Sequence, residues 1–248
     1  MISANRTLTR ARLVRDNGRV TSEVLQGAVE TSPQLVIFDL DGTLTDSAQG
    51  VVASFRHALT AVGAEVPTGD LAARVVGPPI QDTLAGMGLG DRAADALVAY
   101  RADYTSRGWA INSLYDGIAD LLADLRAAGV RLAVATSKVE QTARLILDHF
   151  GIAAHFEVIA GASPDGSRAA KSDVLSHALA QLGPLPDRVL MVGDREHDVI
   201  GAAEHGIDTV VVEWGYGADD FTGAGACVPA AMVSSVRQLR ELLGVPDA

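Results

Sequence analysis

Five short apolar runs, each separated from the next by helical patterns, constrain the fold of this chain more than any other feature. The runs lie at residues 34–38, 131–135, 156–160, 188–192 and 208–212. Their nearly continuous apolar character is typical of strands that are buried on both faces of a parallel sheet. Amphipathic helical patterns follow at 117–128, 140–150 and 172–182. The alternation predicts an α/β fold with a doubly wound parallel sheet.

The first gap between the apolar runs interrupts this alternation. Between residues 47 and 115 there are helical patterns, at 51–62 and 91–107, and no strand candidate. We therefore expect an all-helical insertion after the first strand. The predicted parts are a flexible N-terminal extension at 1–33, a core at 34–47 and 116–248, and a helical cap at 48–115.

Composition limits the class of protein. The 248 residues are 48% apolar with a net charge of −11, which is typical of a soluble globular protein and disfavours nucleic acid as a partner. No apolar segment approaches the ~18 residues that a membrane span needs. Cys227 stands alone, so neither a disulfide nor a cysteine zinc site is expected within the chain. A cytoplasmic location fits these features.

The first 33 residues differ in charge from the rest of the chain. They carry five Arg against Asp16, Glu23 and Glu30, and they lack sustained apolar periodicity. We interpret them as flexible. A transit peptide is the alternative, but its usual lack of acidic residues is not matched here.

Asp39 and Asp41 come directly after the first strand. Residues i and i+2 of a strand share a face, so these carboxylates project together at an edge where α/β sheets bind ligands. Mg²⁺ would offset their repulsion, with one carboxylate attacking phosphorus and the other carrying protons. The simpler alternative is a solvated turn. An EF-hand loop does not fit, because Leu44 and Gly50 stand where it requires Gly and Glu.

Two later segments add hydroxyl and cationic groups. Thr136 and Ser137 follow the second strand, where hydroxyl and backbone N–H groups can hold phosphate oxygens, although a helix cap is an equal alternative. Lys171 opens a helix and could balance a phosphoryl group, although an isolated lysine more often lies on the surface. Lys138 and Lys171 are the only lysines among 20 basic residues, which suggests sites where a compact ammonium is needed. A P-loop does not fit, since its glycines are absent before Lys171.

The fourth strand ends in a further acidic segment, Gly193-Asp194-Arg195-Glu196-His197-Asp198. Asp198 lies one helical turn beyond Asp194 and returns to the same face. Further carboxylates at a strand end suit a magnesium site with few protein ligands. We interpret His197 as a capping or surface residue.

These segments resemble, in order and approximate spacing, the four motifs of the haloacid dehalogenase (HAD) superfamily of phosphohydrolases, over residues 34–215. The resemblance implies a Rossmann-like core and an aspartyl-phosphate at Asp39, with Asp41 as general acid/base. It implies that Thr136 and Lys171 hold the phosphoryl group, with Ser137 at the substrate. Mg²⁺ would be bound by Asp39, the Asp41 carbonyl and Asp194, supported by Asp198.

The helical insertion is similar to the cap of the phosphoglycolate phosphatase-like branch, and Gly77-Pro78-Pro79 resembles its substrate-facing cap loop. Many relatives have proline after the motif-three lysine, whereas this chain has Ser172. That arrangement resembles a nucleotidase-like sub-branch, so the implied substrates are phosphoglycolate-like or nucleotide-like monoesters. Arg101, Tyr104 and this loop are the alternatives for the part of the insertion that faces the substrate.

The catalytic region is also similar to a bacterial HAD-fold protein described as a protein tyrosine kinase, although the motifs of ordinary protein kinases are absent. Three functions follow as hypotheses. The first is a phosphatase for small phosphate monoesters. The second is a phosphotransferase acting on a protein tyrosine, with the extension guiding a partner protein. The third, a non-catalytic binding module, is disfavoured because no motif residue is missing.

Overall fold

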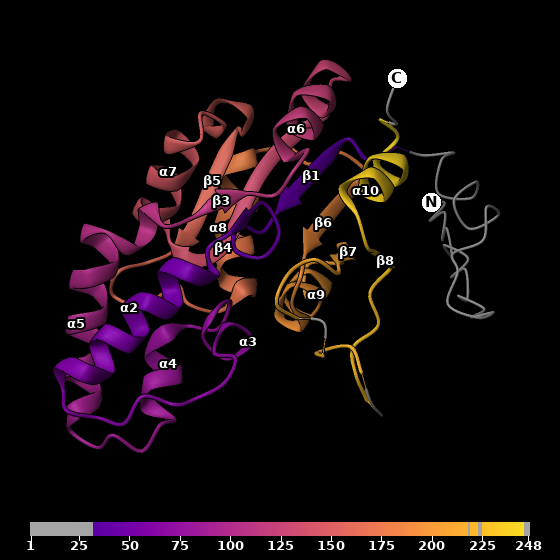
Figure 1. Ribbon diagram of the computed structural model, residues 1–248. Coiled ribbons are helices and arrows are strands. Elements are labelled where there is room, and N and C mark those ends of the chain that lie inside the picture. The colour runs from indigo at the N-terminus through magenta and orange to yellow at the C-terminus, as the bar shows by residue number, and fades with distance from the viewer. Residues whose placement is uncertain (1–31, 218, 223–224, 246–248) are drawn as a thin grey trace.

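The computed structural model describes residues 32–217, 219–222 and 225–245. The predicted flexible extension at 1–33 lies almost entirely outside these residues. Figure 1 shows a central sheet with helices on both faces and a separate group of helices at one end. None of the helices in the described part of the chain has the length and apolar character needed to span a bilayer.

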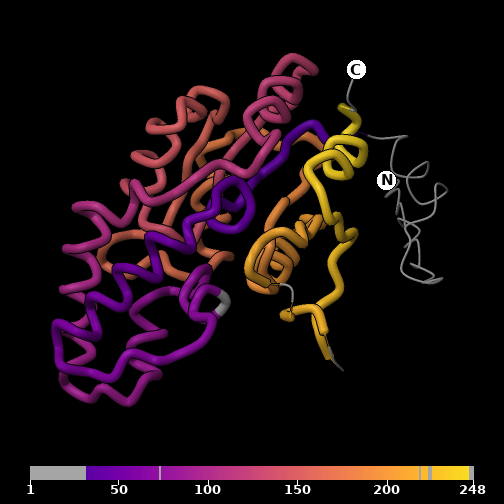
Figure 2. The backbone as a smooth tube through the Cα atoms, viewed as in Figure 1, coloured from indigo at the N-terminus to yellow at the C-terminus, as the bar shows by residue number. Residues whose placement is uncertain are grey.

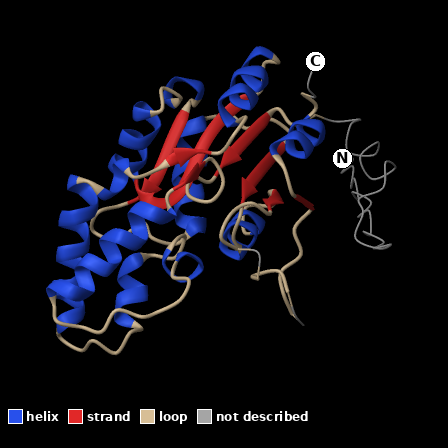
Figure 3. Ribbon diagram, in the orientation of Figure 1, coloured by secondary structure: helices blue, strands red, loops and turns tan. Residues whose placement is uncertain are grey.

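All six strands of the main sheet run parallel, in the order β5-β4-β1-β6-β7-β8. They are β1 (Leu35–Phe38), β4 (Arg131–Val139), β5 (Val158–Ala162), β6 (Val189–Gly193), β7 (Asp208–Val212) and β8 (Ala231–Val233). Red strands enclosed by blue helices in Figure 3 confirm the predicted doubly wound α/β fold. The five expected strands are all present. Sequence patterns did not predict β8, whose three residues are too few to form a recognisable apolar run.

Alternate residues of β1 point to opposite faces of the sheet, as the period of a strand requires. Val36 and Phe38 pack in one apolar cluster with α6 (Ile118–Ala127), α7 (Glu140–His149) and α10 (Val236–Leu243). Leu35 and Ile37 pack in a second cluster with α8 (Lys171–Leu182) and α9 (Glu196–Ala203). Burial of both faces explains why β1 shows no polar alternation.

A helical segment interrupts the sheet after β1, and Figure 2 shows the chain leaving and returning. It has its own apolar cluster, which includes Phe55, Leu59 and Tyr104. Its helices are α2 (Ala48–Ala61), α3 (Ala72–Val75), α4 (Ile80–Ala85), α5 (Arg92–Ser106) and the 3-10 turn Gly108–Ala110. A second 3-10 turn, Ala153–His155, lies between α7 and β5, outside the insertion.

Two short antiparallel strands, β2 (Thr45–Asp46) and β3 (Ser113–Leu114), join the helical segment to the sheet. Sequence patterns missed both, because two-residue strands with polar members carry no periodicity. They bring the entry and exit of the insertion side by side. The segment between them is the one we expect to act as a cap.

Candidate active site

The acidic motif residues converge beyond the carboxyl ends of the central strands. Asp39 directly follows β1, and its N–H donates to the Val192 carbonyl of β6 at 2.9 Å. Asp194 directly follows β6, and Thr136 lies within β4 on the other side of β1. All three are at most 2% exposed, so these polar groups are enclosed by protein. The sheet order therefore brings together groups that are far apart in sequence.

Lys171 is the cationic centre of this cluster. Its Nζ lies 3.0 Å from Asp39 Oδ1 and 2.8 Å from Asp198 Oδ1, and it donates to the Ala135 carbonyl at 2.9 Å. Burial alone disfavours the ammonium charge, but Asp198 and Asp39 outweigh burial and raise the pKa of Lys171 above its ordinary value. Lys171 is therefore a buried ammonium whose charge is balanced by two carboxylates.

Asp198 holds the start of α9 against the cluster. Its Oδ2 accepts hydrogen bonds from the N–H groups of Asp194 at 3.2 Å and Arg195 at 3.0 Å, while Oδ1 faces Lys171. Burial would raise the pKa of Asp198, but Lys171 and these donors hold it below its ordinary value. Both Asp198 oxygens are thus engaged by protein groups, which favours a supporting role over direct metal binding.

In contrast to Asp198, Asp194 and Asp39 have pKa values above the ordinary value. Burial raises the pKa of Asp194 well above its ordinary value, and the charges of Asp198 and Asp39 add to this effect. Burial also raises the pKa of Asp39, against the opposing effect of Lys171. Two carboxylates that resist ionisation so close together call for additional positive charge.

Two buried oxygens of the cluster lack both a hydrogen bond and an ion pair among the described residues: Asp41 Oδ1 and Asp194 Oδ1. An unpartnered buried carboxylate oxygen is costly unless a cation or a proton compensates it, and hard divalent ions prefer oxygen ligands. Asp39, His197 and Asp198 also offer ligand atoms within 4.8 Å of one another. We favour Asp194 over His197 and Asp198 as a ligand, because Asp198 is already paired with Lys171 and bonded to two N–H groups, and because Mg²⁺ prefers oxygen to imidazole nitrogen.

Gly42 is required beside Asp194. Its φ of +83° is one that residues with a side chain rarely adopt, and an added Cβ would collide with the Asp194 carboxylate. The tight turn after Asp41 therefore needs glycine both for its backbone angle and for space.

Thr136 and Ser137 do not cap the following helix. Helix α7 has Val139 at its N-cap position and no side-chain cap, while Thr136 Oγ1 accepts the Lys138 N–H at 3.2 Å. Lys138, which sequence analysis singled out only for its rarity, lies in the site, with Nζ 2.9 Å from Asp41 Oδ2. Both lysines of the chain thus contact motif aspartates.

The helical insertion reaches the site from two directions. Tyr104 of α5 is buried and its hydroxyl accepts a hydrogen bond from Lys138 Nζ at 2.7 Å, whereas Arg101 is exposed. At the other side, Arg195 Nη1 donates to the Val76 carbonyl at 2.9 Å. A Cβ added to Gly77 would lie 3.3 Å from Arg195 Cγ and 3.5 Å from His197 Cε1, so the Gly77-Pro78 turn contacts the start of α9. Sequence analysis did not anticipate Arg195.

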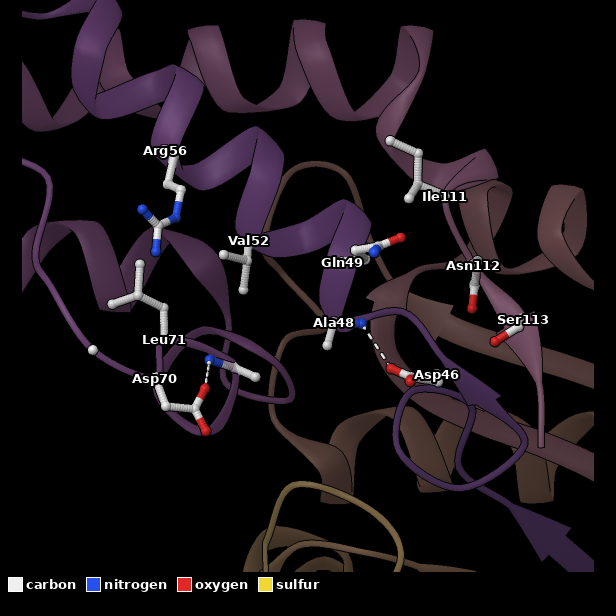
Figure 4. Close-up of a pocket in the computed structure, with 12 residues that line it drawn as sticks. Asp46, Ala48, Gln49, Val52, Arg56, Asp70, Leu71, Ile111, Asn112 and Ser113 are labelled. Atoms are coloured by element: carbon white, nitrogen blue, oxygen red, sulfur yellow. Dashed lines mark hydrogen bonds between the residues drawn. The ribbon is translucent and has the colours of Figure 1, made fainter.

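Open space adjoins β2 and β3, which we call the hinge because they join the insertion to the sheet. A hollow of about 610 Å³ lies beside α2, with Asp46, Asn112 and Ser113 at one end and Arg56 and Asp70 at the other (Figure 4). A second hollow of about 430 Å³ is lined by Pro78 and Arg195, among others. Neither includes the aspartates of the cluster. The acidic cluster itself lies among buried residues.

Comparisons with known proteins show what the chain is similar to. A family model described as haloacid dehalogenase-like hydrolase matches residues 36–212. The chain is 62% identical over 249 residues to the tyrosine-protein kinase PtkA of Mycobacterium tuberculosis, covering 94% of this chain and 86% of PtkA. The solved structure of that kinase covers 86% of this chain and 99% of its own, with 69% identity and a TM-score of 0.78.

Two relatives carry phosphatase names. A 5'-nucleotidase of Pseudomonas aeruginosa is 36% identical over 210 residues, covering 84% of this chain and 94% of its own. A phosphoglycolate phosphatase of Rhodospirillum rubrum is 34% identical over 228 residues, covering 87% and 92%.

Proposed function

Because the chain belongs to the haloacid dehalogenase-like hydrolases, we propose that it is a Mg²⁺-dependent phosphatase that acts on small phosphate monoesters through an aspartyl-phosphate at Asp39. Membership confirms the family predicted from the motifs, and relatives named 5'-nucleotidase and phosphoglycolate phosphatase support the substrate class. The observation that carries the proposal is the pairing of Asp39 with buried Lys171 beside two unpartnered carboxylate oxygens.

We assign three ligands to Mg²⁺: the Asp39 carboxylate, the Asp194 carboxylate and the backbone carbonyl of Asp41. Asp198 supports them. The unpartnered Asp194 Oδ1 fits this assignment, because a hard cation satisfies an oxygen that the protein leaves bare. When bound, the ion would neutralise the carboxylates and polarise the phosphoryl group.

In the proposed reaction, an Asp39 carboxylate oxygen attacks phosphorus and the ester P–O bond breaks. Asp41 donates its proton to the departing alkoxide, and then takes a proton from the water that attacks the aspartyl-phosphate. This second attack breaks the bond between phosphorus and Asp39 and releases inorganic phosphate. Lys171 and Thr136 hold phosphoryl oxygens throughout, with Ser137, Gly77 and Pro78 at the substrate.

We further propose that residues 48–115 act as a cap over the core formed by 34–47 and 116–248. A docked cap would exclude bulk water while leaving room for a single attacking water. A cytoplasmic location remains part of the proposal, since Cys227 has no partner cysteine in the chain.

A panel of phosphate monoesters, assayed with Mg²⁺ for released inorganic phosphate, tests the proposal. We expect turnover of small esters by the native chain and its loss in Asp39→Asn, which keeps the shape of the side chain but removes the nucleophile. Turnover that survives in Asp39→Asn would contradict an aspartyl-phosphate at this position.

A second candidate is a phosphotransferase that acts as a protein tyrosine kinase. It is favoured by the 62% identity to a protein named tyrosine-protein kinase. The first step would be the same, and a tyrosine hydroxyl of a partner protein would replace water as acceptor. Incubation with labelled ATP and candidate proteins distinguishes the two. Alkali-stable phosphotyrosine that depends on Asp39, without hydrolysis of small esters, would favour the kinase and refute the phosphatase.

A further inference from the structure

Lys138 occupies an irregular part of β4. Thr136 pairs with Gly161 and Val139 pairs with Ala162, so two residues on β4 lie between partners that are adjacent on β5. Extra residues on one strand form a bulge, which bends the strand and redirects side chains, often beside active sites. Here the extra residues are Ser137 and Lys138.

The bulge directs Lys138 to a specific pair of oxygens. Its Nζ lies 2.9 Å from Asp41 Oδ2 and 2.7 Å from the Tyr104 hydroxyl. The Lys138 side chain is only 8% exposed, so this ammonium exchanges most of its water for these two partners. One partner comes from the core and the other from helix α5 of the insertion.

Contacts with Lys138 leave the two oxygens of Asp41 unequal. Oδ2 is taken by Lys138, while Oδ1 is buried with no hydrogen-bond partner in the described part of the chain. Oδ1 is therefore the oxygen that is available to carry a proton. A side chain held at one oxygen is restricted in rotation, which is how a proton-transferring group is kept oriented.

Tyr104 is itself firmly placed. Its ring stacks on Tyr100 with centroids 5.5 Å apart and an interplanar angle of 6°, and it packs so closely on Gly108 that an added Cβ would lie 2.8 Å from Tyr104 Cδ2. The hydroxyl that Lys138 reaches thus moves only when the insertion moves.

A structural role alone explains this arrangement poorly. A buried ion pair adds little net stability compared with well-packed apolar side chains, because both charges lose their hydration. Lys138 also shares no carboxylate with Lys171. Lys138 contacts Asp41, whereas Lys171 contacts Asp39 and Asp198. The two lysines therefore serve different aspartates.

We propose that Lys138 is a positioning residue for Asp41, and that its bond to Tyr104 makes this positioning depend on a docked helical insertion. The inference rests on the proposed function of Asp41 as general acid/base. It assigns to Lys138 the orientation of proton transfer, in contrast to Lys171, which contacts the nucleophile.

Leaving-group dependence tests this role. Protonation by Asp41 matters for an alkyl phosphate, whose alkoxide leaves poorly, and matters little for p-nitrophenyl phosphate, whose phenolate leaves without help. We expect Lys138→Met to lower kcat/KM for ethyl phosphate by roughly 10–100-fold, a part of the 10²–10⁴-fold typical of acid catalysis, and for p-nitrophenyl phosphate much less. Tyr104→Phe keeps the ring. It should lower the ratio of kcat/KM for ethyl phosphate to kcat/KM for p-nitrophenyl phosphate as Lys138→Met does, but by a smaller factor.

Thr105→Val is the matched control, because it removes an exposed hydroxyl of the same helix that donates to the Arg101 and Ala102 carbonyls of that helix. Its ratio should equal that of the native chain. In the double variant, Tyr104→Phe should add nothing to Lys138→Met, since both remove one connected contact.

Equal losses for both esters in Lys138→Met, or an unchanged ratio in both Lys138→Met and Tyr104→Phe, would overturn the inference. If Lys138→Met fails to fold, Tyr104→Phe alone decides it, since that change removes one atom from a packed ring. A native chain that hydrolyses neither ester would instead refute the proposed phosphatase function, and with it the basis of this role.

Discussion

The Asp194 carboxylate accepts a hydrogen bond from the Tyr216 N–H at 2.7 Å through Oδ2, while its Oδ1 has no partner among the described residues. At the scale of single residues, this asymmetry predicts metal binding that can be measured without turnover. Mg²⁺ at 100 times its Kd should stabilise the fold by about 2.7 kcal/mol. Each kcal/mol should raise Tm by about 2–4 °C. Asp194→Asn should lose most of this gain.

Asp208→Asn is the control for that experiment, because Asp208 is an exposed aspartate at the opposite, amino end of β7. It should keep the full shift in Tm with Mg²⁺. A shift that is retained in Asp194→Asn would argue that the ion binds elsewhere.

The raised pKa values of Asp194 and Asp39 predict the pH dependence of the metal-free protein. Between the ordinary aspartate pKa of about 3.9 and these raised values, the folded state binds more protons than the unfolded state. Stability should therefore be greatest at the acidic end of this interval and fall as pH rises. Mg²⁺ requires the ionised form, so its stabilising effect should grow over the same interval. Denaturant titrations at several pH values, with and without Mg²⁺, check both trends.

Asp194→Asn gives the sign of this effect at one residue. Since it removes a buried carboxylate that is costly to ionise, the metal-free variant should be more stable than the native chain at pH 8. A less stable variant would mean that the Tyr216 contact outweighs the cost of the charge.

At the scale of elements, the β4 bulge depends on a glycine in the neighbouring strand. A Cβ on Gly161 would lie 2.5 Å from the Lys138 carbonyl oxygen and 2.6 Å from Glu140 Cα, both backbone atoms that cannot rotate away. We expect Gly161→Ala to destabilise the fold by about 1–3 kcal/mol, as overpacking does. It should also reduce turnover, because Thr136 and Lys138 lie on the displaced segment.

Gly86→Ala is the matched comparison, because Gly86 ends α4 with φ of −69° and an added Cβ meets nothing closer than 3.4 Å. It should be neutral or stabilising by up to about 1 kcal/mol. Urea midpoints measure both variants, and equal effects would show that the bulge tolerates displacement.

The same elements explain what could be predicted from sequence. Strands β1, β4, β5, β6 and β7 were predictable because burial on both faces makes them apolar runs. The convergence of Asp39, Asp194 and Lys171 then followed from the rule that ligands bind beyond the carboxyl ends of parallel strands. Lys138 was missed, because its direction depends on the bulge, which arises from pairing between β4 and β5. Its rarity was the one available signal.

At the scale of the whole molecule, the insertion and the sheet have separate clusters of buried apolar residues. The two parts meet through Trp109, which packs against a cluster of each, and through polar contacts. Tyr216 makes one of them: its hydroxyl donates to Asp46 Oδ1 at 2.6 Å and accepts the Ala48 N–H at 3.1 Å, while its own N–H holds Asp194. The start of α2 is thereby joined to the acidic cluster through one residue.

Tyr216→Phe should release the hinge without disturbing the sheet, because the ring and the backbone N–H remain and only the hydroxyl is lost. The expected cost is about 1 kcal/mol, the usual value of one intramolecular hydrogen bond. Hydrogen exchange should quicken in the first turn of α2 and across β2 and β3, and stay unchanged in β1 and β6. Thr105→Val, which removes a hydroxyl bonded to carbonyls of its own helix in the insertion, should leave the hinge amides protected. Separate apolar clusters joined by a hinge predict that local opening reaches only the elements beside the hinge. Faster exchange throughout the sheet would instead mean that the insertion and the sheet unfold as one unit.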